Sequence, residues 1–196
     1  MARFLGRHIM LKKEWGDLLL EGRKRATVRL GVVRPKYDEL IVHSGGRPIA
    51  KVRVVGVRVK RVRDLTDYDA RLDGFSSREE LVEALRRAYG DVRPEDTVTI
   101  IEFELVKRLD ELESDDPYMG LEPADIARLA LRYLQGELSR EEERILRSLT
   151  ATNSIRTTAQ KLYGSPLNRA RVRRALRRAL RMLVEKGLIG GAPYKP

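Results

Sequence analysis

A short acidic segment, residues 110–117, constrains the organisation of this chain more than any other part of the sequence. It carries five acidic side chains in eight residues, ends in a proline and is followed by Gly120. Like charges extend a chain and proline stops a helix, so the segment is typical of a linker, with the solvated last turn of a helix as the alternative. We therefore predict a first domain over 1–109, an acidic linker over 110–120 and a second domain over 121–196.

The charge is distributed unevenly over these three parts. The 196 residues include 40 Lys and Arg against 29 Asp and Glu, a net charge of +11. The first part has a net charge of +7, the linker −5 and the last part +9. Two basic bodies joined by an acidic segment indicate a polyanionic partner, most often a nucleic acid.

The composition excludes several classes of protein. The chain has no cysteine, which rules out disulfides, cysteine-based metal centres and thiol catalysis. His8 and His43 lack local partners and are interpreted as packed or surface residues, so we expect no metal and no cofactor. No stretch approaches the roughly 18 apolar residues of a membrane span, and no signal peptide is evident. We expect a cytoplasmic protein, and the abundance of Arg and Glu suits a heat-adapted organism.

Hydrophobic periodicity predicts an α+β first domain. Helices are expected over residues 11–21 and 77–89, and strands over residues 26–30, 40–43, 48–62 and 97–106. Gly56 interrupts the alternation within the third strand, which predicts a β-bulge. Curved strands with two helices favour a small β-barrel with flanking helices.

The second domain is predicted to be all-α. Helices are expected over residues 123–135, from about 140 to 149, over 154–163 and over 167–186. Ser139 and Glu142 have the spacing of a capping box at the start of the second of these helices. A short helix, a turn and a long helix, followed by the glycines 190 and 191, are similar to a helix-turn-helix with a rudimentary wing.

The densest polar cluster beside regular structure lies in residues 22–29. On a strand Arg25, Thr27 and Arg29 share one side, with Lys24 at the preceding turn. A hydroxyl, an ammonium and guanidinium groups together suit an anionic or carbonyl-bearing ligand. The alternative is a basic edge strand that resists aggregation. The predicted ligand-binding residues of this cluster are Arg23, Lys24, Arg25, Thr27 and Arg29.

Several ordered sequence segments resemble the ASCH domain, particularly its archaeal members. The matching segments are residues 8–13, 17–24, 27–31, 62–66, 69–77 and 98–103, and the resemblance covers about residues 5–108. It implies a PUA-like β-barrel with a cleft between barrel and helices, associated with recognition of RNA or modified nucleosides. In the amidohydrolase members, which deacylate acetylated cytidine, a Lys and a Thr from this motif act with a later carboxylate.

Carried over by this resemblance, Lys24 would activate the nucleophile Thr27, and Asp73 would act as general acid and base. Arg29 would hold the substrate or an oxyanion. Asp73 stands where the family pattern has Glu, and its side chain is one methylene shorter. A displacement of about 1 Å costs on the order of a hundredfold in rate. Asp69 and Glu102 are other carboxylates that could replace it.

The last predicted helix carries a basic face. At about 100° per residue its arginines gather opposite its apolar residues, and no acid at i,i+4 relieves their repulsion. Contact with phosphates is the favoured interpretation, and a solvated face or a membrane surface are the alternatives. The predicted nucleic-acid-binding residues of this helix are Arg171, Arg173, Arg174, Arg177, Arg178 and Arg181.

Together these patterns predict an RNA-binding protein whose first domain holds a nucleotide or single strand and whose basic helix holds phosphates. Its expected partner is RNA or single-stranded nucleic acid, with duplex DNA as a further partner of the second domain, and no membrane. The alternatives are an amidohydrolase acting on N4-acetylcytidine-type nucleosides and a DNA-binding regulator. Trp15, at helical spacing with Leu11 and Leu18, is interpreted as a core residue, and Tyr37 as a candidate base-stacking residue.

Overall fold

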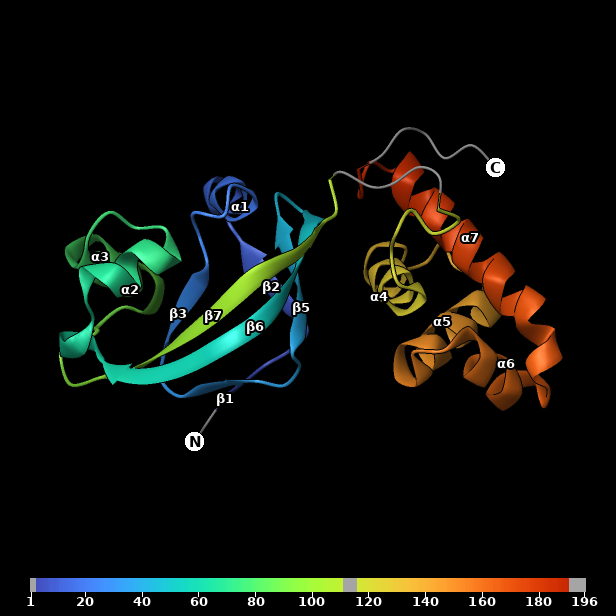
Figure 1. Ribbon diagram of the computed structural model, residues 1–196, viewed down its shortest axis with the longest axis horizontal. Helices are drawn as coiled ribbons and strands as arrows, with labels where there is room; N and C mark the ends of the chain where they lie inside the picture. The colour runs from blue at the N-terminus through green and yellow to red at the C-terminus, as the bar shows by residue number, and fades with distance from the viewer. Residues whose placement is uncertain (1–2, 111–115, 191–196) are drawn as a thin grey trace. The chain divides into compact units, whose positions relative to one another are not determined.

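A computed structural model describes residues 3–110 and 116–190 of the chain (Figure 1). It divides into two compact units, Met1–Leu109 and Asp110–Pro196, which are described separately. Most of the predicted acidic linker, residues 111–115, lies outside the described residues.

The first unit is built on a strongly curved five-stranded sheet in the order β2-β5-β6-β7-β3. Strand β2 pairs with β5 in parallel, and the other neighbours are antiparallel. Strands β1 (Arg3–Leu5) and β4 (Val33–Pro35) form a separate parallel pair. The strands of the main sheet are β2 (His8–Leu11), β3 (Ala26–Leu30), β5 (Glu39–Ser44), β6 (Arg47–Arg61) and β7 (Thr97–Arg108). Since β2 and β3 remain unjoined edges, the sheet is a half-barrel and not the closed barrel expected from the sequence.

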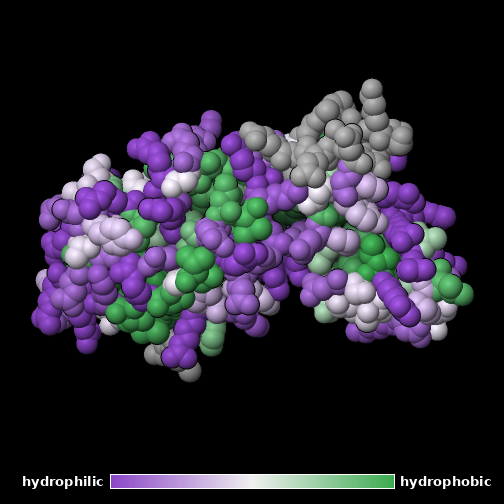
Figure 2. Space-filling model, in the orientation of Figure 1, coloured by the Kyte–Doolittle hydropathy of each residue, from purple (hydrophilic) through white to green (hydrophobic). Residues whose placement is uncertain are grey.

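The predicted bulge in β6 is confirmed by a register shift between Val54 and Gly56. One extra residue moves the following side chains to the other face of a sheet. Beyond the bulge Val57 and Val59 are therefore 44% and 54% exposed. The alternate residues Arg58 and Lys60 point to the opposite face, where both bond to Asp69. Figure 2 shows apolar side chains exposed on the front of this sheet.

Helices cover both faces of the half-barrel. Helix α1 (Lys13–Leu20) packs on one face, over a core that includes Leu19 and Phe103. Helices α2 (Asp67–Asp73) and α3 (Arg78–Tyr89) pack on the other, over a core that includes Leu81 and Ile100. The sequence predicted the strands β3, β5, β6 and β7 and the helices α1 and α3, but not α2, β1, β2 or β4.

The second unit consists of four packed helices. They are α4 (Pro123–Tyr133), α5 (Arg140–Thr152), α6 (Ile155–Tyr163) and α7 (Arg169–Glu185). The capping box of Ser139 and Glu142 is confirmed at the start of α5. Residues 116–190 contain no strand, so the expected wing is absent from this described part of the unit. Within both described ranges, no helix combines the length and apolar character of a membrane span.

Candidate functional site

A cleft of about 750 Å³ opens along the edge strand β3 of the first unit. Helix α1 forms one wall, and the end of α2 together with α3 forms the other (Figure 1). The polar side chains at its base come from the segment singled out in the sequence and from α2. Its lining includes Trp15, Lys24, Thr27, Arg29, Asp73 and Phe75.

A buried ion pair joins Lys24, two residues before β3, to Asp73 at the end of α2. The Lys24 ammonium contacts one carboxylate oxygen of Asp73 and donates to its carbonyl oxygen at 2.8 Å. The other carboxylate oxygen accepts the backbone N–H of Val28 at 2.8 Å. Lys24 and Asp73 are only 4% and 5% exposed. Asp73 thus satisfies an edge N–H of the sheet and a buried cation at once.

The surroundings of Asp73 alter its acidity. Burial raises the pKa of its carboxyl group above the ordinary value, against the opposing effects of Lys24, the Val28 N–H and the charge of Arg29. A buried carboxyl group with a raised pKa is suited to proton transfer nearer to neutral pH.

Two glycines shape the chain around this pair. Gly22 follows α1 with φ +73°, and the backbone N–H groups of Arg23 and Lys24 then both donate to Leu18. Gly74 ends α2 with φ +96°, where a Cβ atom would lie 3.2 Å from the Trp15 ring. Only glycine combines this conformation with this close approach.

Two polar groups in the cleft have no partner among the described residues. The Thr27 hydroxyl makes no hydrogen bond there, and its side chain is 6% exposed. The Nε atom of Arg29 is buried and unpaired within the described ranges. Unsatisfied polar groups at the base of a cleft are available to a ligand that supplies their partners.

Aromatic rings line the walls above these groups. Trp15 and Phe75 lie with ring centroids 4.6 Å apart, and the Lys24 ammonium lies 5.4 Å from the Trp15 ring. The interpretation of Trp15 as a core residue is therefore wrong, because its ring is half-buried and borders the cleft. Tyr37 packs elsewhere, beneath the Arg7 guanidinium at 3.8 Å.

The structure brings together three of the five residues predicted from the motif. Lys24, Thr27 and Arg29 line the cleft together with Asp73, which comes from a segment 49 residues away. Arg23 and Arg25 are exposed and are not part of the lining, whereas Lys24 between them is buried and lines the cleft.

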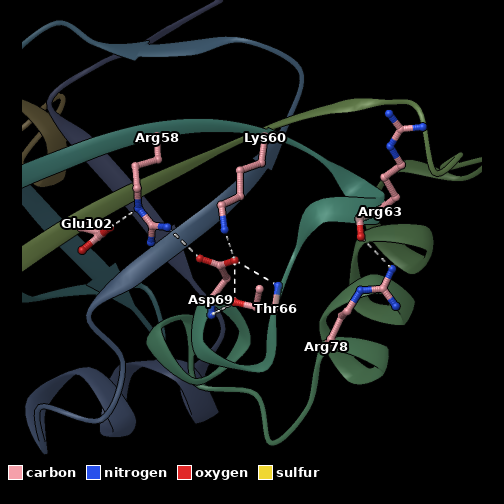
Figure 3. A network of polar contacts seen from close by, with 7 residues as sticks. All are labelled: Arg58, Lys60, Arg63, Thr66, Asp69, Arg78 and Glu102. Carbon is pink, nitrogen blue, oxygen red and sulfur yellow. Dashed lines mark hydrogen bonds and ion pairs between the residues drawn. The ribbon is translucent and has the colours of Figure 1, made fainter.

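Asp69 occupies a second polar network one helical turn before Asp73 (Figure 3). Its fully buried carboxylate accepts from Arg58 at 3.0 Å and from Lys60 at 2.7 Å, and it caps α2 through Thr66. Arg58 also pairs with Glu102 at 2.6 Å. Asp69 and Glu102 do not line the cleft, so neither occupies the position of Asp73.

The two histidines contact each other, which their separation in the sequence concealed. His8 Nδ1 and His43 Nε2 lie 2.8 Å apart, because β2 and β5 pair in parallel at this point. His43 is fully buried and His8 is partly buried, and no local sequence pattern indicated that the two rings are in contact. The described residues contain no group of three or more His, Asp or Glu that is placed to hold a metal ion.

The predicted arginines of α7 are all exposed, and the apolar side of the helix is buried. Arg178 pairs with Glu142 on α5, and Arg171 lies over the Tyr163 ring at 5.1 Å. Burial raises the pKa of Glu142, but the Arg178 and Ser139 interactions outweigh burial and lower it overall. The charges of Arg178 and Glu142 therefore compensate each other within the second unit.

Comparison with known proteins identifies the first unit. The sequence model of the ASCH domain matches residues 2–107, more than half of the chain, and the chain belongs to this family. The resemblance to the ASCH domain, a PUA-like fold, is thereby confirmed. ASCH domains are generally associated with RNA binding.

Two solved structures illustrate the similarity. One is an ASCH domain from Lactobacillus crispatus JV V101, with 20% identity over 53% of this chain and 80% of that chain, and a TM-score of 0.45. The other is ASCH from Zymomonas mobilis, with 13% identity over 53% of this chain and 69% of that chain, and a TM-score of 0.42. No curated protein matches the chain.

Proposed function

We propose that the protein binds RNA and that the cleft holds an unpaired nucleotide. The observation that supports this most directly is that aromatic walls occur together with an unpartnered hydroxyl group, on Thr27, and an unpaired guanidinium Nε atom, on Arg29. The rings of Trp15 and Phe75 offer surfaces for stacking, and Thr27 and Arg29 offer groups that hydrogen-bond a base or a phosphate.

The size of the cleft agrees with this ligand. Sites for small molecules enclose roughly 300–1,000 Å³, and this cleft has about 750 Å³. Stacking of a base on an aromatic side chain contributes about 1–3 kcal/mol. The buried Lys24–Asp73 pair keeps the base of the cleft polar, so a ligand must bring matching polar groups.

Fluorescence provides a direct test, because Trp15 is the only tryptophan of the chain. Titration with a mixed-sequence 12-nucleotide RNA should quench its emission, and Phe75→Ala and Arg29→Gln should each weaken the response. Arg23→Gln is the matched control, since Arg23 is exposed outside the cleft lining, and it should leave the quenching unchanged. Unaltered emission at low salt, or equal losses from Arg23→Gln and Arg29→Gln, would contradict the proposal.

A second function is supported by the contact between Lys24 and Asp73. We propose as the alternative that the cleft hydrolyses an N-acyl nucleoside. The Thr27 oxygen attacks the acyl carbon and its proton passes to the Lys24–Asp73 pair, which returns a proton to the departing amine. Water then releases the acid from the Thr27 ester.

Incubation with N4-acetylcytidine tests this alternative, with cytidine measured by chromatography. Turnover that is lost in Thr27→Ala and restored in Thr27→Ser supports it. Because the family pattern has Glu at this position, Asp73→Glu should increase turnover. No cytidine from either the parent chain or Asp73→Glu, in proteins that remain folded, excludes the alternative.

A further inference from the structure

The exposed face of α7 separates into compensated and uncompensated arginines. Arg171 and Arg178 interact with Tyr163 and Glu142. By contrast, Arg173, Arg174 and Arg177 are exposed and have no ion pair or hydrogen bond to any residue that the structure describes. Contacts within the protein account for Arg171 and Arg178. They do not account for the other three arginines.

The uncompensated arginines form a compact cationic surface. Arg173 and Arg177 are four residues apart, which is about 6 Å along a helix, and Arg174 lies beside both. Like charges at this spacing destabilise a helix by about 0.2–0.5 kcal/mol per pair. Among its 17 residues α7 has one acidic side chain, Glu185, at its last position.

The chemistry of this surface differs from that of the cleft. The sequence of α7 contains no aromatic residue, so the helix itself offers no ring on which an unpaired base could stack, and Arg171 already lies over the neighbouring Tyr163 ring of α6. Single-stranded nucleic acids are generally bound by a basic groove combined with such rings. The apolar side of α7, including Leu176 and Leu180, is fully buried, so the helix has no free apolar side to insert into a lipid surface.

We propose that Arg173, Arg174 and Arg177 bind the phosphates of a nucleic-acid double helix. A duplex has the highest density of phosphate charge, about one per 1.7 Å of axis in DNA, and needs no stacking surface. The proposal rests on the proposed function of the cleft in one respect. If the cleft holds an unpaired nucleotide of an RNA, the same RNA would also contain a duplex stem for the three arginines. RNA and DNA duplexes share the phosphate chemistry, and the experiment separates them.

The test uses the full chain and fluorescence anisotropy with three labelled probes: a 16-base-pair RNA duplex, a DNA duplex of the same sequence and the single-stranded RNA. The variant carries R173Q, R174Q and R177Q together. The control carries R140Q, R144Q and R147Q, which removes three exposed arginines from α5, where Glu141, Glu142 and Glu143 lie between Arg140 and Arg144. Thermal unfolding shows that each variant remains folded.

We expect the α7 variant to lose at least tenfold in affinity for a duplex, whereas the α5 control stays within twofold. Each lost phosphate contact should also reduce the slope of log K against log salt by about 0.9. A larger effect with RNA assigns the surface to stems of RNA, and a larger effect with DNA assigns it to duplex DNA. Equal losses in both variants, an unchanged α7 variant, or a larger loss for the single strand would overturn the proposal.

Failure at this surface is distinguishable from failure at the cleft. Quenching of Trp15 by single-stranded RNA reports on the cleft alone and should persist in the α7 variant. Vesicles of phosphatidylserine serve as the anionic lipid probe. Binding to vesicles that is lost in the α7 variant, without binding to either duplex, would overturn the assignment to nucleic acid.

Discussion

The cleft and the α7 surface both concentrate charge, but they hold it in opposite ways. In the cleft Lys24 and Asp73 are almost fully buried and each is the main partner of the other. On α7 the three uncompensated arginines are exposed and have no partner within the described ranges. A buried charge without a partner is strongly destabilising, whereas an exposed one is solvated by water.

Mutations that remove a charge should therefore have different consequences in the cleft and on α7. Removing a charge from the cleft leaves its partner buried and unpaired, so the folded state loses stability together with any ligand contact. Removing a charge from α7 costs the folded state little and acts on binding. The buried pair of Lys24 and Asp73 and the exposed, uncompensated arginines of α7 thus lie in different units of the chain.

The largest expected effect is that of Lys24→Met. It leaves the Asp73 carboxylate buried without its counter-charge, and breaking a buried pair in this way costs about 3–5 kcal/mol. Urea unfolding measures the loss. The double variant Lys24→Met with Asp73→Asn should recover part of it, since no buried charge then remains. A loss below 1 kcal/mol for the single variant would mean that the pair does not hold α2 to β3.

Asp69→Asn should have a smaller effect, about 2 kcal/mol. Asp69 is fully buried, but its partners Arg58 and Lys60 are partly exposed, so water solvates them when the carboxylate is lost. Urea unfolding again provides the measurement. A loss equal to that of Lys24→Met would show that exposure of the partners does not matter.

The two carboxylates should also give opposite pH dependence. Burial raises the pKa of Asp69, but bonds from Lys60 and Thr66 outweigh burial and hold it below its ordinary value. Its contribution to stability is therefore present above the ordinary pKa and is lost as pH falls through the lowered one. Asp73 has a raised pKa, so its effect on stability has the opposite sign. Its contribution to stability is fully present below the ordinary pKa and is lost as pH rises through the raised pKa.

Stability curves from pH 2 to pH 7 measure these slopes. Compared with the parent chain, Asp69→Asn should lose less stability as pH falls, whereas Asp73→Asn should lose more. The same change of slope in both variants would contradict the assignment of opposite pKa shifts.

Gly74→Ala should cost about 1–2 kcal/mol, the penalty of a left-handed conformation for a residue with a Cβ atom. The added atom also approaches Trp15, so the emission maximum of Trp15 should shift. Gly136→Ala is a suitable control, because Gly136 also has a positive φ but no neighbour within 4 Å of its Cβ position. A shift of Trp15 emission in both variants would rule out a local effect at the cleft.

The smallest expected effect on stability belongs to the α7 variant with R173Q, R174Q and R177Q. Its free energy of unfolding should stay within about 0.5 kcal/mol of the parent chain, with a slight gain from relieved repulsion. A loss above 1 kcal/mol would indicate that these arginines have structural partners, and the contrast between the two regions would then be invalid.

Local sequence patterns determined much of this protein. The alternation and the glycine of β6 predicted a bulged strand, Ser139 and Glu142 predicted a helix start, and the spacing of arginines and leucines on α7 predicted one exposed basic face. Each of these features depends on neighbours within a few residues. The backbone geometry of a strand or helix is enough to translate such spacing into a face.

The family resemblance grouped Lys24, Thr27 and Asp73, but only the tertiary structure decided how the candidate site is assembled. Asp73 meets Lys24 across 49 residues, because α2, which the sequence did not predict, packs its buried face against the edge of β3. Trp15 borders the cleft although its helical spacing equally suits a core position, and His8 meets His43 because β2 pairs with β5. These contacts depend on register and packing between distant segments, which no local periodicity encodes.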